Sequence, residues 1–341
     1  MTNEKLFKKT MLKIGIAMII FVVAFNVLFS VLSIIMSILE LFMQEIPYNI
    51  LSELLYAIVY LASFFIPAII LRAITKKDAH PIMLKRYIPS GIDIAAYVLA
   101  TISMVLTMAI LNAKFVEIFN YAEFSSEFLW GNDKLAPYQL VLSFITTAIV
   151  PAICEEFLFR GAILSALKPY GKAPAIVISG VLFGLMHQNI EQLLYTTIAG
   201  LVLAWVVYET GSIWVSVLIH FFNNFVSVFE TAVIDRLYEK PAMIIIYTFE
   251  ALIFIFGIAS VVYLLVKHSK KKRESGNIIS DGIYGKAMNE ITRDDMIPER
   301  PLPAGKVARC FFSPTIIVFM VLSGATMLLN IVFSILYSYI Q

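Results

Sequence analysis

Long runs of apolar residues, broken by short polar segments, make up most of the chain. One helical crossing of a bilayer core needs about 20 apolar residues, so the pattern predicts about eight to nine transmembrane helices. The runs at residues 14–43 and 137–168 are longer than one crossing requires. The predicted helices lie near residues 14–43, 50–74, 91–113, 137–168, 172–188, 192–208, 212–229, 242–266 and 313–340.

The composition agrees with this pattern and excludes a soluble domain. Of the 341 residues, 60% are hydrophobic and 15% are charged, whereas a soluble domain carries about 25% charged residues. The first apolar run follows a basic flank but is about twice as long as the core of a signal peptide, and no small-residue cleavage site follows it. We therefore predict an all-α, multi-pass integral membrane protein whose first helix is retained.

Basic residues are distributed unevenly between the two sides of the predicted bundle. With the N-terminus placed inside, the outside loops hold only four of the 26 Lys and Arg residues, namely Lys114, Lys134, Arg236 and Lys240. This bias fits the positive-inside rule, and it predicts nine crossings with the N-terminus inside and the C-terminus outside. Because the basic residues follow topology, they give no reason to expect a nucleic-acid partner.

The chain divides into five parts along this topology. Its one long polar stretch, which begins KHSKKKR, is interpreted as a solvated cytoplasmic loop. No internal repeat is evident, which weakens a transporter interpretation. The five parts are helices one to three with their loops (1–136), a core (137–229), an eighth helix (230–266), the basic loop (267–312) and the last helix (313–341).

Ionisable groups inside membrane helices cost several kcal/mol, so each one is a functional hypothesis by default. Glu53, Asp93 and Glu250 are isolated and near predicted helix ends, and we interpret them as structural. The remaining polar groups fall in three consecutive apolar regions. They are Glu155, Glu156 and Arg160 in the first, His187 in the second, and His220, Asn223 and Asn224 in the third.

Helical spacing sorts this set, because residues four apart share a helix face. Glu156 and Arg160 are so spaced and can form an ion pair, whereas Glu155 points about 100° away and is predicted to stay unpaired. An unpaired carboxylate in a low-dielectric environment suits a general acid or base. In the next two regions, Phe183 shares a face with His187, and His220 with Asn224.

The depth of these groups predicts that they meet. At 1.5 Å per residue, Glu155 and His187 each lie roughly 20 Å from the inner boundary, and His220 and Asn224 roughly 12 and 18 Å. We expect all four to line one buried polar cavity. Pro151, one turn before Glu155, is expected to kink its helix and open space for water.

Two kinds of chemistry fit these residues. His187 and His220, with Glu155, can bind zinc and leave a position open for water. Alternatively, Glu155 aided by His187 takes a proton from water without a metal, while His220 and Asn224 donate hydrogen bonds to an oxyanion. Both routes hydrolyse an acyl bond. The chain contains no H-E-x-x-H, G-x-S-x-G or G-x-G-D motif, so zincin, rhomboid-like serine and presenilin-like aspartyl routes are unsupported.

The same residues resemble the pattern of a known family. Glu155-Glu156-x-x-x-Arg160, Phe183-x-x-x-His187 and His220-x-x-x-Asn224 are similar to the motifs EExxxR, FxxxH and HxxxN of the CPBP family, which includes CAAX proteases and bacteriocin-processing or immunity proteins. The resemblance implies an intramembrane endopeptidase, with or without zinc. It implies that Glu155 activates water with help from His187, that His220 and Asn224 stabilise the oxyanion or bind metal, and that Glu156, Arg160 and Phe183 support the site.

The sequence constrains the identity of the substrate less closely than it constrains the type of reaction. In eukaryotic members of the family it is a prenylated protein that loses the last three residues of a CaaX sequence. The composition of this chain is typical of bacteria, which generally lack that modification. We therefore expect a membrane-embedded or lipid-anchored peptide or protein substrate, in a bacterial cytoplasmic membrane. Two alternatives stay open: a non-catalytic scaffold or immunity factor, and a transporter that uses the cavity as its ion or substrate site.

Overall fold

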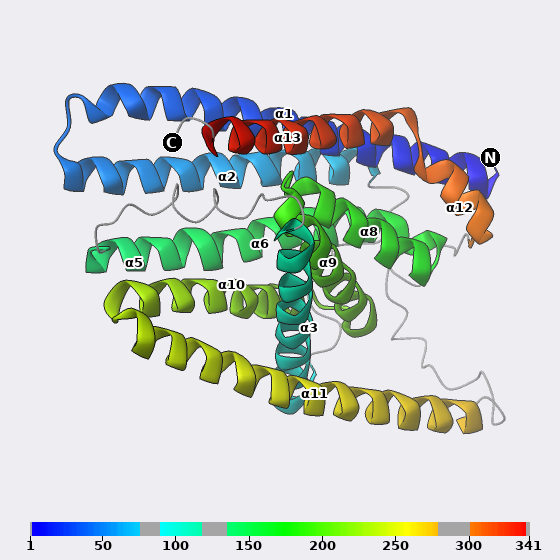
Figure 1. Ribbon diagram of the computed structural model, residues 1–341. Coiled ribbons are helices and arrows are strands. Elements are labelled where there is room, and N and C mark those ends of the chain that lie inside the picture. Colours follow the sequence, from blue (N-terminus) through cyan, green and yellow to red (C-terminus); the bar gives the residue numbers. More distant parts are fainter. Residues whose placement is uncertain (1, 76–88, 118–134, 279–300, 339–341) are drawn as a thin grey trace.

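The computed structural model describes residues 2–75, 89–117, 135–278 and 301–338, and within these ranges every regular element is a helix (Figure 1). The predicted all-α fold is confirmed. The elements are α1 (Asn3–Glu40), α2 (Glu45–Thr75), α3 (Gly91–Glu117), α5 (Pro137–Ser143), η1 (Phe144–Ile149), α6 (Val150–Glu156), η2 (Phe157–Leu164), α7 (Ser165–Leu167), η3 (Lys168–Tyr170), α8 (Lys172–Met186), α9 (Ile190–Thr210), α10 (Ile213–Arg236), α11 (Glu239–Ile278), α12 (Ala304–Phe311) and α13 (Pro314–Ser338).

Eight helices in the described ranges are long and apolar enough to cross a membrane, which agrees with the predicted eight to nine. The exception is α8, which has 15 residues and spans about 22 Å against a bilayer core of about 30 Å. The chain turns back after α8 at Gln188, whose φ is 52°. Lys172 at the start of α8 pairs with Glu209 near the end of α9. The two helices therefore form a hairpin that starts and finishes at one end of the bundle.

Several boundaries differ from the hydropathy pattern. The basic flank before the first apolar run is helical, because Thr2 caps α1 by accepting a hydrogen bond from the backbone N–H of Lys5. The predicted basic loop contains the last turns of α11 and all of α12. Its middle part, residues 279–300, lies outside the described residues, as does most of the predicted outside loop before Leu135.

The long helix predicted at residues 137–168 is present but irregular. Two π-helical segments, η1 and η2, flank the short α6 that carries Pro151, Glu155 and Glu156. A proline cannot donate to the carbonyl one turn earlier, and a π turn is a common way to accommodate such a break. The predicted disturbance at Pro151 therefore takes the form of a π segment just before it.

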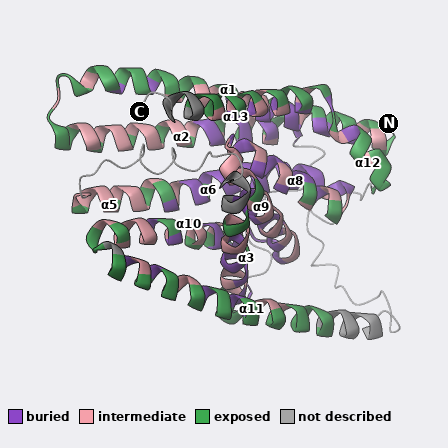
Figure 2. Ribbon diagram, in the orientation of Figure 1, coloured by how far each residue is buried: buried purple, intermediate pink, exposed green. Residues whose placement is uncertain are grey.

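The site-bearing helices pack closely at the centre of the molecule, where Figure 2 shows most of the buried residues. A Cβ atom added at Gly200 of α9 would lie 2.9 Å from the carbonyl oxygen of Gly180 on α8. Small residues allow this close approach of helix backbones, as is common in membrane bundles. Around this centre, α1 packs against α2 and α13, and α3 against α9 and α11.

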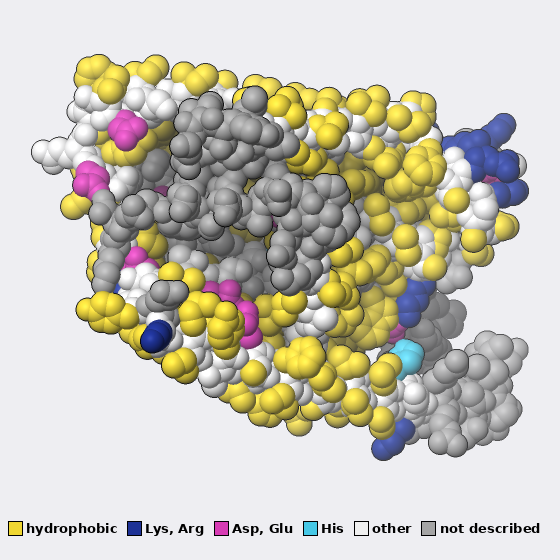
Figure 3. Space-filling view, viewed as in Figure 1, with side chains coloured by type: hydrophobic (Ala, Val, Ile, Leu, Met, Phe, Trp, Pro, Cys, Tyr) yellow, Lys and Arg dark blue, Asp and Glu magenta, His cyan; other side chains and the backbone are white. Residues whose placement is uncertain are grey.

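The two ends of the bundle differ in charge. Lys and Arg side chains gather at the end that holds the N-terminus and α12 (Figure 3). At that end Lys13 donates to the carbonyl of Ile74 at 2.6 Å, which joins the start of α1 to the end of α2. At the other end Arg236 of α10 donates to the carbonyl of Leu135 at 2.7 Å, just before α5 begins. The start of α5 therefore lies at the lysine-poor end.

Candidate active site

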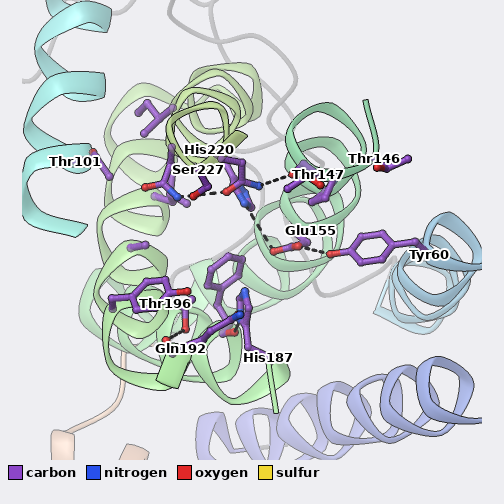
Figure 4. Close-up of a pocket in the computed structure, with 18 residues that line it drawn as sticks. Tyr60, Thr101, Thr146, Thr147, Glu155, His187, Gln192, Thr196, His220 and Ser227 are labelled. Carbon is purple, nitrogen blue, oxygen red and sulfur yellow. Dashed lines mark hydrogen bonds and ion pairs between the residues drawn. The ribbon is translucent and has the colours of Figure 1, made fainter. Parts of the chain in front are cut away.

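A cavity of about 380 Å³ lies at the centre of the bundle. Glu155 from α6, His187 from the end of α8 and His220 from α10 line it (Figure 4). Asn224 from α10 lines it as well. The structure thus brings together the four residues that depth and spacing predicted to meet. Its remaining polar lining includes Tyr60 from α2, Thr101 from α3, Gln192, Tyr195 and Thr196 from α9, and Asn223 and Ser227 from α10.

Glu155 is buried, and its two carboxylate oxygens have different surroundings. The hydroxyl of Tyr60 donates a hydrogen bond to Oε1, so the expectation that Glu155 has no partner is wrong for that oxygen. Among the described residues Oε2 has no hydrogen-bond partner. It lies 3.9 Å from Nε2 of His220, which is too far for a direct hydrogen bond but suits a bridging water molecule.

Glu156 and Arg160 form the ion pair that their spacing predicts. Nη1 of Arg160 lies 2.7 Å from Oε1 of Glu156, and both side chains are fully buried. Arg160 also donates to the carbonyl of Gly200 at 2.8 Å, and its guanidinium lies 4.6 Å from the ring centre of Phe183. The charge of Arg160 is thereby compensated by a carboxylate, a carbonyl and an aromatic face, which offsets part of the desolvation cost of burial.

The same Glu156 oxygen holds one catalytic candidate in place. Nδ1 of His220 lies 3.0 Å from Oε1 of Glu156. A carboxylate paired with arginine only accepts hydrogen bonds, so Nδ1 of His220 is the donor. In a neutral imidazole the other ring nitrogen then carries a lone pair. When His220 is neutral, its Nε2 atom therefore faces Glu155 as a hydrogen-bond acceptor.

The ring nitrogens of His187 are arranged like those of His220. Its Nδ1 atom lies 3.0 Å from the carbonyl oxygen of Phe183, which can only accept, so Nδ1 is the donor and Nε2 is left as an acceptor. The ring of Phe183 contacts both imidazoles, with centroid distances of 5.1 Å to His187 and 5.8 Å to His220. The cavity is thus rich in acceptors, an arrangement that favours taking a proton from water.

Asn224 also makes a hydrogen bond to the backbone, in addition to the role predicted for it. Its Nδ2 atom donates to the carbonyl of Thr147 at 3.1 Å. That carbonyl lies four residues before Pro151, the position whose helical hydrogen bond a proline cannot make. One N–H of the Asn224 amide therefore satisfies the backbone break, and the other remains for a ligand in the cavity.

The turn that carries His187 is held from two distant helices. Asn26 of α1 donates to the side-chain oxygen of Gln188 at 3.0 Å. Asn330 of α13 donates to the backbone carbonyl of Gln188 at 3.2 Å. Gln188 is 5% exposed, so these bonds satisfy polar groups that water reaches poorly. We call Asn26, Gln188 and Asn330 the turn clamp.

A zinc ion was one of the two predicted ways to activate water. The residue types are suitable, because His187 and His220 present unprotonated nitrogens and Glu155 a free oxygen. However, nowhere in the described part of the chain do three His, Cys, Asp or Glu side chains gather closely enough to hold a metal ion. The arrangement therefore does not fit a three-ligand zinc site.

Tyr60 is the main site residue that the sequence did not reveal. It lies 95 residues before Glu155, in an apolar helix where a tyrosine is unremarkable. The polar lining contributed by α9 was missed for the same reason. The sequence does contain a weak signal for polar lining on the long helix. Gln139, Ser143 and Thr147 recur every four residues there, and the same spacing continues to Pro151 and Glu155.

Comparison with known proteins supports the motif resemblance. Residues 137–226 match the model of a family described as "Type II CAAX prenyl endopeptidase Rce1-like". The chain is also 34% identical over 105 residues to a Bacillus subtilis (strain 168) protein named "Putative membrane peptidase YdiL". This match covers 30% of the present chain and 42% of the relative. No solved structure matches. The resemblance to the CPBP family is confirmed for this segment, which contains all three motifs.

Proposed function

From this CPBP-type core, we propose that the protein is an intramembrane endopeptidase that uses Glu155 to activate water. The observation that carries the proposal is the free Oε2 atom of Glu155, buried and 3.9 Å from the acceptor nitrogen of His220 in a polar cavity. A buried carboxylate oxygen without a donor is costly. Oε2 of Glu156 also lacks a partner among the described residues, but of the two glutamates only Glu155 lines the large cavity. A reacting water molecule between Oε2 of Glu155 and Nε2 of His220 supplies the missing donors.

The proposed reaction begins with proton transfer. Water donates one O–H to Oε2 of Glu155 and the other to a histidine Nε2, and Glu155 takes the first proton as the water oxygen attacks the peptide carbonyl carbon. The carbonyl π electrons move to the carbonyl oxygen. When the tetrahedral intermediate collapses, the C–N bond breaks and the departing nitrogen takes the proton from Glu155. Tyr60 holds the carboxylate in the attacking orientation throughout.

The oxyanion needs a donor, and the histidine tautomers limit the choice. A neutral His220 has no proton on Nε2, so it donates to the oxyanion only as an imidazolium. The Asn224 amide donates without needing to be protonated. One of its N–H groups is bonded to Thr147, and the other is available to the oxyanion. We therefore assign the oxyanion primarily to Asn224, with Nε2 of His187 or His220 as the acceptor for the water O–H that does not point at Glu155.

The position of the cavity supports the proposed substrate class. The site lies among helices long enough to span a bilayer, so the scissile bond belongs to a membrane-embedded or lipid-anchored peptide or protein. Within a bundle of helices, such a segment must unwind locally to expose its backbone to Glu155. The polar lining by Gln192, Asn223 and Ser227 offers hydrogen bonds to that unwound backbone.

Replacement of Glu155 tests the proposal. Glu155→Gln keeps the shape and the acceptor for Tyr60 but cannot take a proton, so we expect cleavage to fall by about 10²–10⁴-fold. Glu250→Gln is the matched control, because it removes a membrane-helix carboxylate that does not line the cavity. Peptide products are compared by mass spectrometry in cells and in proteoliposomes. Unchanged products in Glu155→Gln would contradict the proposal and favour a scaffold.

A further inference from the structure

A smaller cavity of about 120 Å³ lies between the first turns of α2 and α5. Its polar lining comes from Asn49 and Glu53 on α2 and from Gln139 and Ser143 on α5. Thr146 and Thr147 line both this cavity and the large one that contains Glu155. The two cavities are therefore neighbours that share a wall of two threonines.

Both helices lead from the smaller cavity to the catalytic candidates. On α2, Glu53 precedes Tyr60 by seven residues, which is two helical turns, so the two side chains share a face about 10 Å apart along the helix. Tyr60 contacts Glu155. On the long helix, Ser143, Thr147, Pro151 and Glu155 follow one another at intervals of four residues. A polar track thus connects Glu53 to Glu155.

Glu53 is the one charged residue among the described residues that line the smaller cavity. No hydrogen bond or ion pair joins its carboxylate to another described side chain. The neighbouring Asn49 amide donates to the hydroxyl of Tyr138 at 3.4 Å, and the side-chain oxygen of Gln139 accepts from the backbone N–H of Ala136 at 2.6 Å. The described neighbours thus make no hydrogen bond to Glu53, and its carboxylate is available to a ligand in the cavity.

We propose that the smaller cavity is a subsite for a cationic side chain of the substrate, and that Glu53 is the residue that selects it. This inference rests on the proposed peptidase activity. An extended peptide advances about 3.3 Å per residue, so the rise of about 10 Å from Glu53 to Tyr60, which contacts Glu155, corresponds to three residues. Glu53 therefore selects lysine or arginine about three residues from the scissile bond.

The position of the subsite also gives the direction of approach. It lies beside Leu135, at the lysine-poor end of the bundle, where few basic groups of the protein compete for Glu53. A peptide that enters between α2 and α5 meets Glu53 first and Glu155 further in. The cationic residue then anchors the chain while the unwound backbone lies across the large cavity.

The test uses a random-sequence peptide library with hydrophobic flanks, incubated with the protein in proteoliposomes and analysed by mass spectrometry. For wild-type protein we expect enrichment of Lys and Arg at one position about three residues from the cleaved bond. Glu53→Gln should reduce that enrichment by about tenfold, as loss of a partly desolvated charge partner does. Glu53→Lys should replace it with enrichment of Asp and Glu. Glu45→Gln, an exposed glutamate on the same helix, should leave the profile unchanged.

Failure of this inference and failure of the proposed function look different. If wild-type protein cleaves the library but Glu53→Gln retains the same positional preferences, Glu53 is a structural residue and the subsite assignment is wrong. If neither wild-type protein nor any variant cleaves the library, the proposed peptidase activity itself is contradicted. Equal loss of all cleavage in Glu53→Gln, without a change of profile, would also overturn the subsite.

Discussion

Nδ1 of His220 lies 3.0 Å from Oε1 of Glu156, the same oxygen that pairs with Arg160. The second glutamate of the motif therefore does more than neutralise the arginine. It fixes the His220 tautomer so that Nε2 is an acceptor facing Glu155, in the way that outer carboxylates orient catalytic imidazoles. The Glu156 carboxylate thus connects the ion pair with Arg160 to the catalytic candidate His220.

Glu156 should consequently affect stability and activity separately. Glu156→Gln leaves the buried Arg160 charge uncompensated, and we expect it to destabilise the fold by about 3–5 kcal/mol. The double variant Glu156→Leu with Arg160→Met removes both charges and should recover most of that loss. It should not recover cleavage, because His220 still lacks its acceptor.

Thermal unfolding in detergent and cleavage per folded molecule measure the two effects. Glu191→Gln, on a neighbouring helix, serves as a control for general loss of a carboxylate. If the double variant restored cleavage together with stability, Glu156 would be only a partner for Arg160. The orienting role would then be wrong.

Tyr60 offers a second test, because it is the one donor to Glu155 among the described residues. Tyr60→Phe removes a hydroxyl and keeps the ring, which packs against Phe64 at 4.7 Å. We expect the free energy of unfolding to change by about 1 kcal/mol or less, while kcat falls by about tenfold because the carboxylate loses its orientation. Tyr56→Phe, one turn earlier on α2, is the matched control. Equal activity in the two variants would show that Tyr60 only packs.

The sequence predicted much of this site because helix geometry is local. Spacing of four residues placed Glu156 beside Arg160, and depth placed Glu155, His187 and Asn224 at a similar level. Neither argument needed the tertiary fold. Both used only a rise per residue and the high cost of charge in a bilayer.

What the sequence did not predict depends on contacts between distant helices. Tyr60 reaches Glu155 only because α2 packs against α6, and no periodicity reports that packing. Asn224 was expected to contact an oxyanion or a metal, since nothing in its own helix indicates that the carbonyl of Thr147 needs a donor. The shortness of α8 was hidden for a different reason, because its polar turn follows a continuous apolar run.

The zinc question has a direct measurement. Because the possible ligands are not gathered in the described residues, we expect elemental analysis of purified protein to find well below one zinc per chain, and cleavage to resist chelators. His187→Ala and His220→Ala should then leave the metal content unchanged. One zinc per chain, lost in both variants, would instead mean that the site rearranges to bind metal.

The turn clamp is the last structural device that we expect to matter for activity. Asn330→Leu removes the donor to the Gln188 carbonyl and leaves that buried acceptor unsatisfied, at a cost of about 1–3 kcal/mol. Because Gln188 follows His187 directly, the turn should shift and misplace Nε2 of His187. We expect kcat to fall by about tenfold, which corresponds to about 1.4 kcal/mol, while KM changes little.

Ser323→Ala on the same helix is the matched control, because it removes a buried hydroxyl that has no partner among the described residues. Asn26→Leu should act like Asn330→Leu, and the double variant should lose less than the product of the two effects, since both hold one turn. Steady-state kinetics in proteoliposomes, with thermal unfolding in parallel, measure these changes. If Asn330→Leu lowered the unfolding temperature but left kcat per folded molecule unchanged, α13 would stabilise the bundle without positioning His187. The contact of α13 with the turn after α8 would then be purely structural.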